Sequence, residues 1–163
     1  ILESERLILR GYEESDIAAW QRWETDPEVQ KYLPGPLNKP VTDEQQVAYL
    51  KECLSENNSA YWSIVWKETN EVIGTISFTD IDTNQGVAEL NIIIGEKQYW
   101  GKGIATEAIK SVLDYARVNL GLQKIVAEVE VDNTSIIKTL STCGFAKEGI
   151  PVGSRVKYYY NFS

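Results

Sequence analysis

Hydrophobic and polar residues follow two different periods along this chain, and the shorter period predicts strands. Short apolar or alternating runs bounded by turn residues are typical of strands. A turn at 69–71 makes two of these runs a hairpin, and one other run is almost wholly apolar, as in a central strand. The expected strands cover residues 6–10, 61–66, 72–78, 87–95, 124–131 and 156–160, with a further short strand at Val152.

Apolar residues spaced three and four apart predict helices in four other segments. The longest begins at Ile104 and ends before Gly121, a residue suited to the left-handed cap of a helix. The other three cover residues 16–23, 41–57 and 133–143. The order is mostly antiparallel strands, followed by β-loop-α-β-α, so we expect one mixed α/β domain over residues 1–163.

The acidic composition narrows the range of partners. The net charge is −8 and the pI is near 4.7, whereas nucleic-acid binding needs a basic face. We therefore expect no nucleic acid as a partner. An acidic protein suits a cationic partner such as an amine, although the same charge can serve solubility alone.

The residue types present also limit the chemistry. The sequence has no histidine, which excludes Ser-His and Cys-His dyads and most zinc sites. Cys53 and Cys143 lie far apart in the sequence, so we expect neither a disulfide framework nor a metal site. Proton transfer must then use carboxylates, tyrosine, lysine, serine, water or the main chain.

The chain lacks the usual signals for membranes and secretion. No window approaches the roughly 18 consecutive apolar residues of a membrane span, and the first residues do not combine a basic region with an apolar run. We expect a cytoplasmic protein with no membrane partner. There is no methionine, even at the start, so we expect the chain to be less than the complete translated product.

The most informative motif is Gln98-x-x-Gly101-x-Gly103, which joins the apolar strand to the longest helix. Glycine lets the main chain approach a ligand closely, and the first turn of a helix leaves N–H groups unpaired. Together they can bind a diphosphate, with Lys102 adding charge at the rim. The two glycines alone also fit a plain loop. A dinucleotide-binding motif is disfavoured because several residues separate these glycines from the strand.

The segment 98–108, Gln-Tyr-Trp-Gly-Lys-Gly-Ile-Ala-Thr-Glu-Ala, closely resembles the acetyl-CoA signature of the GNAT superfamily of N-acetyltransferases, in the wording of its RimJ/RimL branch. The resemblance implies an α+β GNAT fold. Its central mixed, mostly antiparallel sheet would have about seven strands and about four flanking helices, with strand 87–95 splayed from its parallel neighbour. The resemblance runs over nearly the whole chain and includes residues 6–10, 72–74, 88–90, 132–133 and 143–145.

By this resemblance the cofactor is acetyl-CoA, with coenzyme A as product. Main-chain N–H groups from 98 to 104 would bind the diphosphate, and the splayed strand would pair with the pantetheine arm. An N–H near Ile92 would be an oxyanion donor. Asn133, the expected N-cap of its helix, would also bond the pantetheine arm. The implied coenzyme-binding residues are Ile92, Ile93, Ile94, Gln98, Tyr99, Trp100, Gly101, Lys102, Gly103, Ile104, Ala105, Thr106, Asn133 and Lys138.

An ammonium cannot attack a thioester, so the enzyme must remove a proton. Glu89 interrupts the apolar strand, and partial burial would raise the pKa of its carboxyl. The resemblance implies that Glu89 is a base acting through water, while a solvent-facing carboxylate at the strand end is the alternative.

The chain departs from the family pattern in its last predicted helix. The usual serine position is occupied by Ile136, and Ser135 lies one residue before it. Leu140 occupies the position at which many members carry a Tyr that acts as general acid. Ser135 stays a catalytic candidate beside Glu89. The thiolate can leave without an acid because a thiol has a pKa near 8.5.

In this family the N-terminal helical region lines the acceptor pocket, which makes Trp20, Trp23 and Tyr32 candidate substrate-binding residues. Core packing is the alternative, and it is the favoured interpretation of the two tryptophans. The expected function is transfer of an acetyl group from acetyl-CoA to a primary amine, on a protein N-terminus or a small molecule, by direct attack in a ternary complex. The alternative is a non-catalytic acyl-CoA-binding module of the same fold. We expect a monomer or a homodimer.

Overall fold

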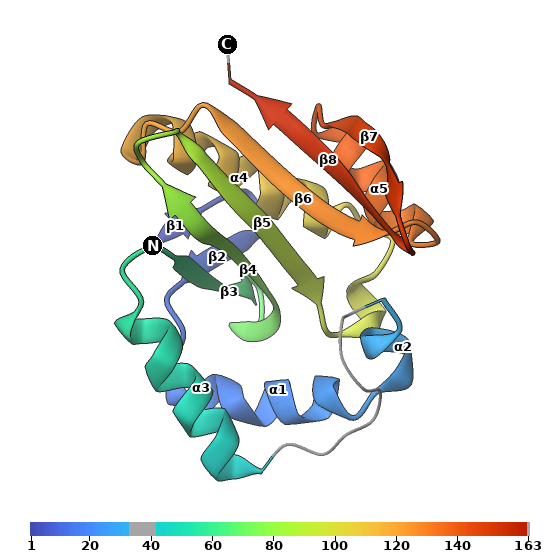
Figure 1. Cartoon of the computed structure of the whole chain (residues 1–163). Helices are drawn as coiled ribbons and strands as arrows, with labels where there is room; N and C mark the ends of the chain where they lie inside the picture. Colours follow the sequence, from blue (N-terminus) through green and yellow to red (C-terminus); the bar gives the residue numbers. More distant parts are fainter. Residues whose placement is uncertain (33–41, 163) are drawn as a thin grey trace.

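One eight-stranded sheet organises the computed structural model, which describes residues 1–32 and 42–162 (Figure 1). The strand order is β1-β2-β3-β4-β5-β6-β8-β7. Neighbouring strands are antiparallel except for β5 and β6, which are parallel. The strands are β1 Leu2–Glu3, β2 Leu7–Arg10, β3 Ala60–Trp66, β4 Glu71–Asp82, β5 Val87–Ile94, β6 Lys124–Glu130, β7 Ala146–Val152 and β8 Arg155–Asn161.

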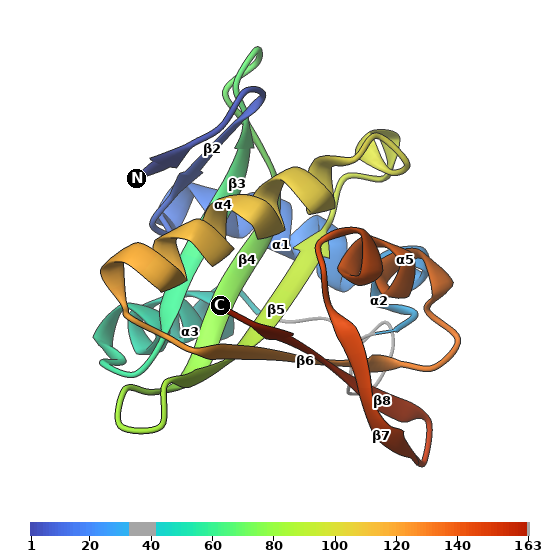
Figure 2. The same ribbon diagram turned by 90° about the horizontal axis from the view of Figure 1, so that it is seen from above.

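Helices cover both faces of this sheet (Figure 2). Helices α4 and α5 pack on one face, and α1, α2 and α3 lie on the other. None of the helices in the described part of the chain is long and apolar enough to cross a membrane. The helices are α1 Ile17–Glu24, α2 Pro27–Gln30, α3 Asp43–Ser55, α4 Ile104–Asn119 and α5 Thr134–Thr142, with 3₁₀ turns η1 Glu14–Asp16 and η2 Lys97–Tyr99.

Side chains alternate between two apolar cores because successive residues of a strand point to opposite faces. The larger core lies between the sheet and the pair α4 and α5, and it includes the fully buried Phe78, Ile109 and Leu140. The smaller core lies under α1 and α3, where Trp20 packs beside Leu50. The strand β5 serves both cores, so its backbone is fixed from the two sides.

The predicted mixed, mostly antiparallel sheet is confirmed, with two additions. The two-residue β1 and the four-residue α2 are too short to show a period. The expected single closing residue Val152 is the end of a longer strand, β7, whose mostly exposed residues do not alternate in hydrophobicity. The helix expected at 41–57 runs from Asp43 to Ser55 with Thr42 as its N-cap, and Val41 lies outside the described residues.

A buried carboxylate anchors the start of α1 to the sheet. Asp16 is 1% exposed and accepts hydrogen bonds from both Nη atoms of Arg10, at 3.0 and 2.9 Å, and from Oγ of Ser63 at 2.6 Å. Its Oδ2 also accepts the main-chain N–H of Glu13 at 2.9 Å. Burial alone would raise the pKa of Asp16, but these donors hold it below its ordinary value. The carboxylate thus ties α1 to β2 and β3.

We predict that Asp16→Asn lowers the free energy of unfolding by about 3 kcal/mol at neutral pH, because it leaves Arg10 without its buried partner. The native pKa of Asp16 is depressed, so its stabilisation is present above the unfolded pKa and is lost as pH falls through the native pKa. Urea unfolding at several pH values measures both effects. The control Asp114→Asn removes an exposed partner of Arg117 and should change stability by less than about 0.5 kcal/mol. Equal losses in the two variants would contradict the anchor.

Candidate active site

The parallel strands β5 and β6 pair over only part of their length. Pairing joins Val87 to Lys124, Ala88 to Ile125 and Glu89 to Val126, and then stops. Both strands continue, β5 to Ile94 and β6 to Glu130, while they diverge (Figure 2). Alternate main-chain N–H and C=O groups of residues 90–94 therefore face a gap rather than a neighbouring strand. This gap is the predicted splay.

The side chains that follow Glu89 on β5 are largely committed to packing. Ile92 and Ile94 contact the larger core, and Ile93 contacts the smaller one. Asn91 is exposed and donates a hydrogen bond from Nδ2 to Oγ1 of Thr79 at 3.0 Å. The side chains of the three isoleucines predicted to bind coenzyme are half-buried in these cores, so their main-chain groups are the polar groups they can offer a ligand.

A loop at the wide end of the gap carries the predicted motif. Gln98 and Tyr99 belong to the 3₁₀ turn η2, and Trp100 donates from Nε1 to the carbonyl oxygen of Ile94 at 2.8 Å. Gly101 and Gly103 have φ values of 74° and 75°, in the left-handed region that favours glycine. Across residues 1–32 and 42–162, the main-chain N–H groups of 101–103 donate to no main-chain oxygen. These donors are free for a ligand.

The loop runs directly into α4, whose N-cap is Gly103. The first N–H groups of a helix have no partner inside it, and the helix dipole is positive at that end. Ile104 points its side chain into the core, whereas Ala105 and Thr106 are half-buried. The exposed Lys102 places Nζ 5.7 Å from the centroid of the Tyr99 ring. Loop and helix together form a site suited to an anion such as a diphosphate.

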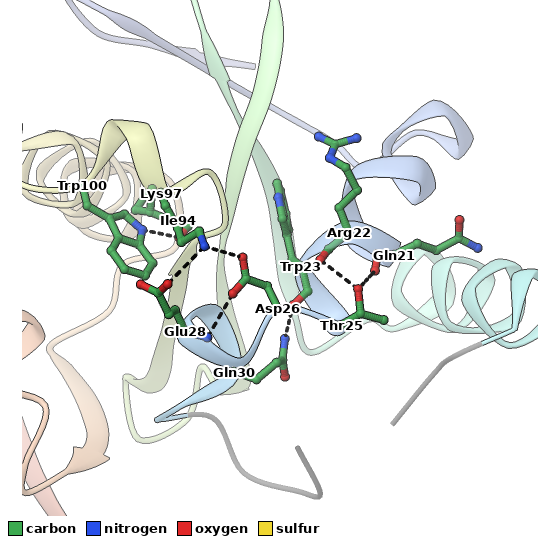
Figure 3. A network of polar contacts seen from close by, with 10 residues as sticks. All are labelled: Gln21, Arg22, Trp23, Thr25, Asp26, Glu28, Gln30, Ile94, Lys97 and Trp100. Atoms are coloured by element: carbon green, nitrogen blue, oxygen red, sulfur yellow. Dashed lines mark hydrogen bonds and ion pairs between the residues drawn. The ribbon is translucent and has the colours of Figure 1, made fainter. Parts of the chain in front are cut away.

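The corner between α1 and α2 holds the start of this loop (Figure 3). Lys97 lies in ion pairs with Asp26 at 3.0 Å and Glu28 at 3.3 Å. The pKa of Asp26 is lowered, first by its bond to Lys97. Arg22 of α1 pairs with Glu96. Ion pairs therefore connect α1 and α2 to the start of the loop.

The aromatic residues predicted to bind substrate lie on this same side. Trp20 and Trp23 are 6% and 5% exposed, so packing accounts for most of their surface. The Trp23 ring covers Gly95, where an added Cβ would overlap it. In the described part of the chain, neither indole N–H has an acceptor. Tyr32 is half-buried with Lys31 Nζ 5.2 Å from its ring centroid. Substrate contact by these three residues stays a prediction.

Glu89 lies at the narrow end of the gap, as the last residue of β5 that pairs with β6. Burial raises the pKa of its carboxyl, and the carboxylates of Asp80 and Glu128 raise it further, against smaller opposing effects of Arg155 and Lys157. The raised pKa agrees with the direction expected for a base. A hollow of about 140 Å³ adjoins it, lined by Asp80, Val87, Ala88, Glu89, Val126, Glu128 and Lys157.

The helix α5 follows β6 at the wide end of the gap. Asn133 caps it, as predicted, by accepting the main-chain N–H of Ile136 at 3.3 Å through Oδ1. Within residues 1–32 and 42–162, its amide NH₂ donates no hydrogen bond. Ser135 and Lys138 are exposed, and threonine hydroxyl groups one turn later donate to their main-chain oxygens. The roles predicted for the three side chains toward coenzyme stay predictions.

The fold thus places the predicted diphosphate site and the predicted base at opposite ends of the gap. The loop 98–103, the first turn of α4 and Asn133 lie where the parallel strands end, and Glu89 lies where they still pair. Sequence reasoning missed the charged side chains that hold the loop, namely Lys97 and the pair Arg6 and Glu107. The dipeptide Asp26-Pro27 was the available signal for α2, since Pro is common at the first position of a helix.

The sequence profile of the acetyltransferase (GNAT) domain matches residues 6–146. The chain therefore belongs to the GNAT acetyltransferase family. Its relatives include uncharacterized N-acetyltransferase p20 of Bacillus licheniformis, which is 39% identical over 153 residues, covering 91% of this chain and 84% of the relative. Uncharacterized N-acetyltransferase YoaA of Bacillus subtilis is 33% identical over 153 residues, covering 92% and 85%.

A solved structure supports the same fold. The spermidine N-acetyltransferase from Vibrio cholerae, in complex with CoA and spermine, matches with a TM-score of 0.84 and 23% identity, over 97% of this chain and 96% of that chain. At this identity the match supports the architecture alone. The RimJ/RimL-like branch stays a prediction.

We predict that Gly95→Ala destabilises the protein by about 2 kcal/mol, because the new methyl group must displace the Trp23 ring. Denaturant unfolding with tryptophan fluorescence measures the loss. Gly11→Ala is the matched control, since a Cβ at Gly11 meets no atom within 4 Å. Unchanged stability of Gly95→Ala would contradict the close packing of the Trp23 ring on Gly95.

Proposed function

We propose that this protein transfers the acetyl group of acetyl-CoA to a primary amine by direct attack within a ternary complex. The observation that carries the proposal is the gap between β5 and β6, which ends at the unpaired N–H groups of residues 101–103. An unpaired strand edge leading to an anion site suits a ligand with an extended amide arm and a diphosphate. Coenzyme A has both parts.

The residues present fit this ligand at three points. The N–H groups of the loop and of the first turn of α4 would hold the diphosphate, with Lys102 adding charge. The edge of residues 90–93 that faces the gap would pair with the pantetheine arm, since the Ile94 carbonyl already accepts the Trp100 indole N–H, and the NH₂ of Asn133 would donate to the arm. A main-chain N–H near Ile92 would stabilise negative charge developing on the thioester oxygen. The bound thioester supplies the activated acetyl group.

Glu89 would act as the base, because a lysine-like amine with a pKa of about 10.4 is protonated at neutral pH. Its carboxylate accepts the ammonium proton directly or through water. The neutral amine nitrogen would then bond to the carbonyl carbon while the C–S bond breaks and sulfur keeps the electron pair. The proton that the new amide nitrogen must still lose would pass to the thiolate, directly or through water, to give the free thiol of coenzyme A. No acid is assigned, since Leu140 is 1% exposed in the core and a thiol has a pKa near 8.5.

The acceptor is proposed only as a class. The relatives of 39% and 33% identity that are named as N-acetyltransferases support an amine, and the net charge of −8 favours a cationic one. Protein N-termini stay among the candidates because residues 98–108 resemble the RimJ/RimL branch, which acetylates protein N-termini. Substrate contact would come from the corner of α1 and α2, where Trp23 lies against the end of β5.

We predict that Gly103→Glu abolishes binding of coenzyme A, because it adds a side chain and a negative charge where the diphosphate would sit. Gly121→Glu is the matched control. It adds the same side chain at the other end of α4, at a glycine that also has a left-handed φ, of 62°. Titration calorimetry should give wild-type heat for the control and none for Gly103→Glu. Equal binding by both variants would contradict the proposal that this loop binds the diphosphate.

We predict that Glu89→Gln lowers turnover about 100-fold near neutral pH, the effect of losing a general base. In the wild type the rate should fall as pH drops through the raised pKa of Glu89. The deficit should narrow at high pH, where the free amine is already abundant. A thiol-release assay with peptides, polyamines, aminoglycosides and lysine as acceptors provides the measurement.

The control for this prediction is Glu128→Gln. The Glu128 carboxylate helps to raise the pKa of Glu89, so its removal should move the acid limb to lower pH while turnover persists. Unchanged turnover in Glu89→Gln would retire Glu89 as the base. Coenzyme binding without turnover on any acceptor would favour the non-catalytic binding module.

A further inference from the structure

The first turn of α4 carries a carboxylate close to the proposed anion site. Glu107 is the fourth residue of that helix, and its side chain is 18% exposed. A free negative charge there would weaken the binding of a diphosphate. The position of Glu107 therefore needs a reason other than coenzyme contact.

Donors from the segment between β1 and β2 occupy this carboxylate. Oε2 of Glu107 accepts hydrogen bonds from Oγ of Ser4 at 2.5 Å and from the main-chain N–H of Arg6 at 2.8 Å. Oε1 accepts Nε of Arg6 at 2.7 Å. Burial alone would raise the pKa of Glu107, but these donors hold it below its ordinary value. Glu107 is thus an ionised anchor for Arg6.

The same guanidinium also contacts the glycine loop 98–103. Nη1 of Arg6 donates to the main-chain oxygen of Lys102 at 3.0 Å. Lys102 lies between the two left-handed glycines, where the backbone has few other restraints. In a trans peptide the C=O of one residue and the N–H of the next point in opposite directions. Fixing the Lys102 oxygen toward Arg6 therefore turns the Gly103 N–H away from Arg6, and in the described residues this N–H donates to no main-chain oxygen.

We propose that Arg6 is a positioning residue for coenzyme binding, which orients the Gly103 N–H through the Lys102 carbonyl while Glu107 holds its guanidinium in place. The inference rests on the proposed function. It assigns a role in the coenzyme site to a residue 96 positions before the carbonyl it holds. Arginine suits this role because its planar fork can bond a carboxylate and a carbonyl at once, which a single ammonium cannot do with the same geometry.

The test is titration of coenzyme A into Arg6→Lys and Arg6→Gln, with thermal unfolding measured on the same samples. Arg6→Lys keeps the charge and the pairing with Glu107 but loses the bond to Lys102. Its Kd should rise about tenfold, the value of one good hydrogen bond, with a melting temperature near that of the wild type. Arg6→Gln should bind more weakly still and unfold at a lower temperature.

Arg117→Lys and Arg117→Gln are the matched controls. Like Arg6, Arg117 pairs with a carboxylate of α4, but that pair with Asp114 is exposed and lies far from the glycine loop. Both should bind coenzyme A as the wild type does. Wild-type affinity in Arg6→Lys, with losses confined to Arg6→Gln, would overturn the inference by showing that Arg6 contributes charge and stability alone. A wild-type protein that binds no coenzyme A would overturn the proposed function itself.

Discussion

The site depends on the point at which β5 and β6 stop pairing. Up to Glu89 and Val126 the two strands satisfy each other's main-chain groups, and beyond that point they do not. A strand edge without a partner is costly inside a protein unless water or a ligand pairs with it. The divergence thus creates a row of donors and acceptors in the middle of the sheet rather than at its rim, and a loop and a helix start lie at its open end.

The glycine loop 98–103 is restrained from both faces of the sheet. On one face, Arg6 and Glu107 connect it to the N-terminal strands. On the other, Lys97 and the contact of Trp23 with Gly95 connect it to α1 and α2. A loop with two left-handed glycines would otherwise sample many conformations. These contacts reduce the entropy that ligand binding would have to remove, which is the general benefit of preorganisation.

The sequence predicted the features that depend on local order. The glycine loop, the long α4 and the central β5 follow from periodicity and capping, and the family signature 98–108 added the sheet arrangement. The short α2 and β1 lack enough residues to show a period. The bond between Arg6 and Glu107 joins residues 101 positions apart, so no local pattern reports it. For the predicted site residues, the structure supplies positions, and their contacts with ligands stay predictions.

The close contact of Trp23 with Gly95 has a consequence for redesign of the proposed acceptor pocket. The indole is a wall of the smaller core and also the surface on which the end of β5 rests. Trimming it to admit a bulkier amine would leave a void under the end of β5, because packed interiors relax only partly around a deletion. Positions 23 and 95 therefore form one unit for protein engineering, and a library that varies them together has access to shapes that single substitutions do not reach.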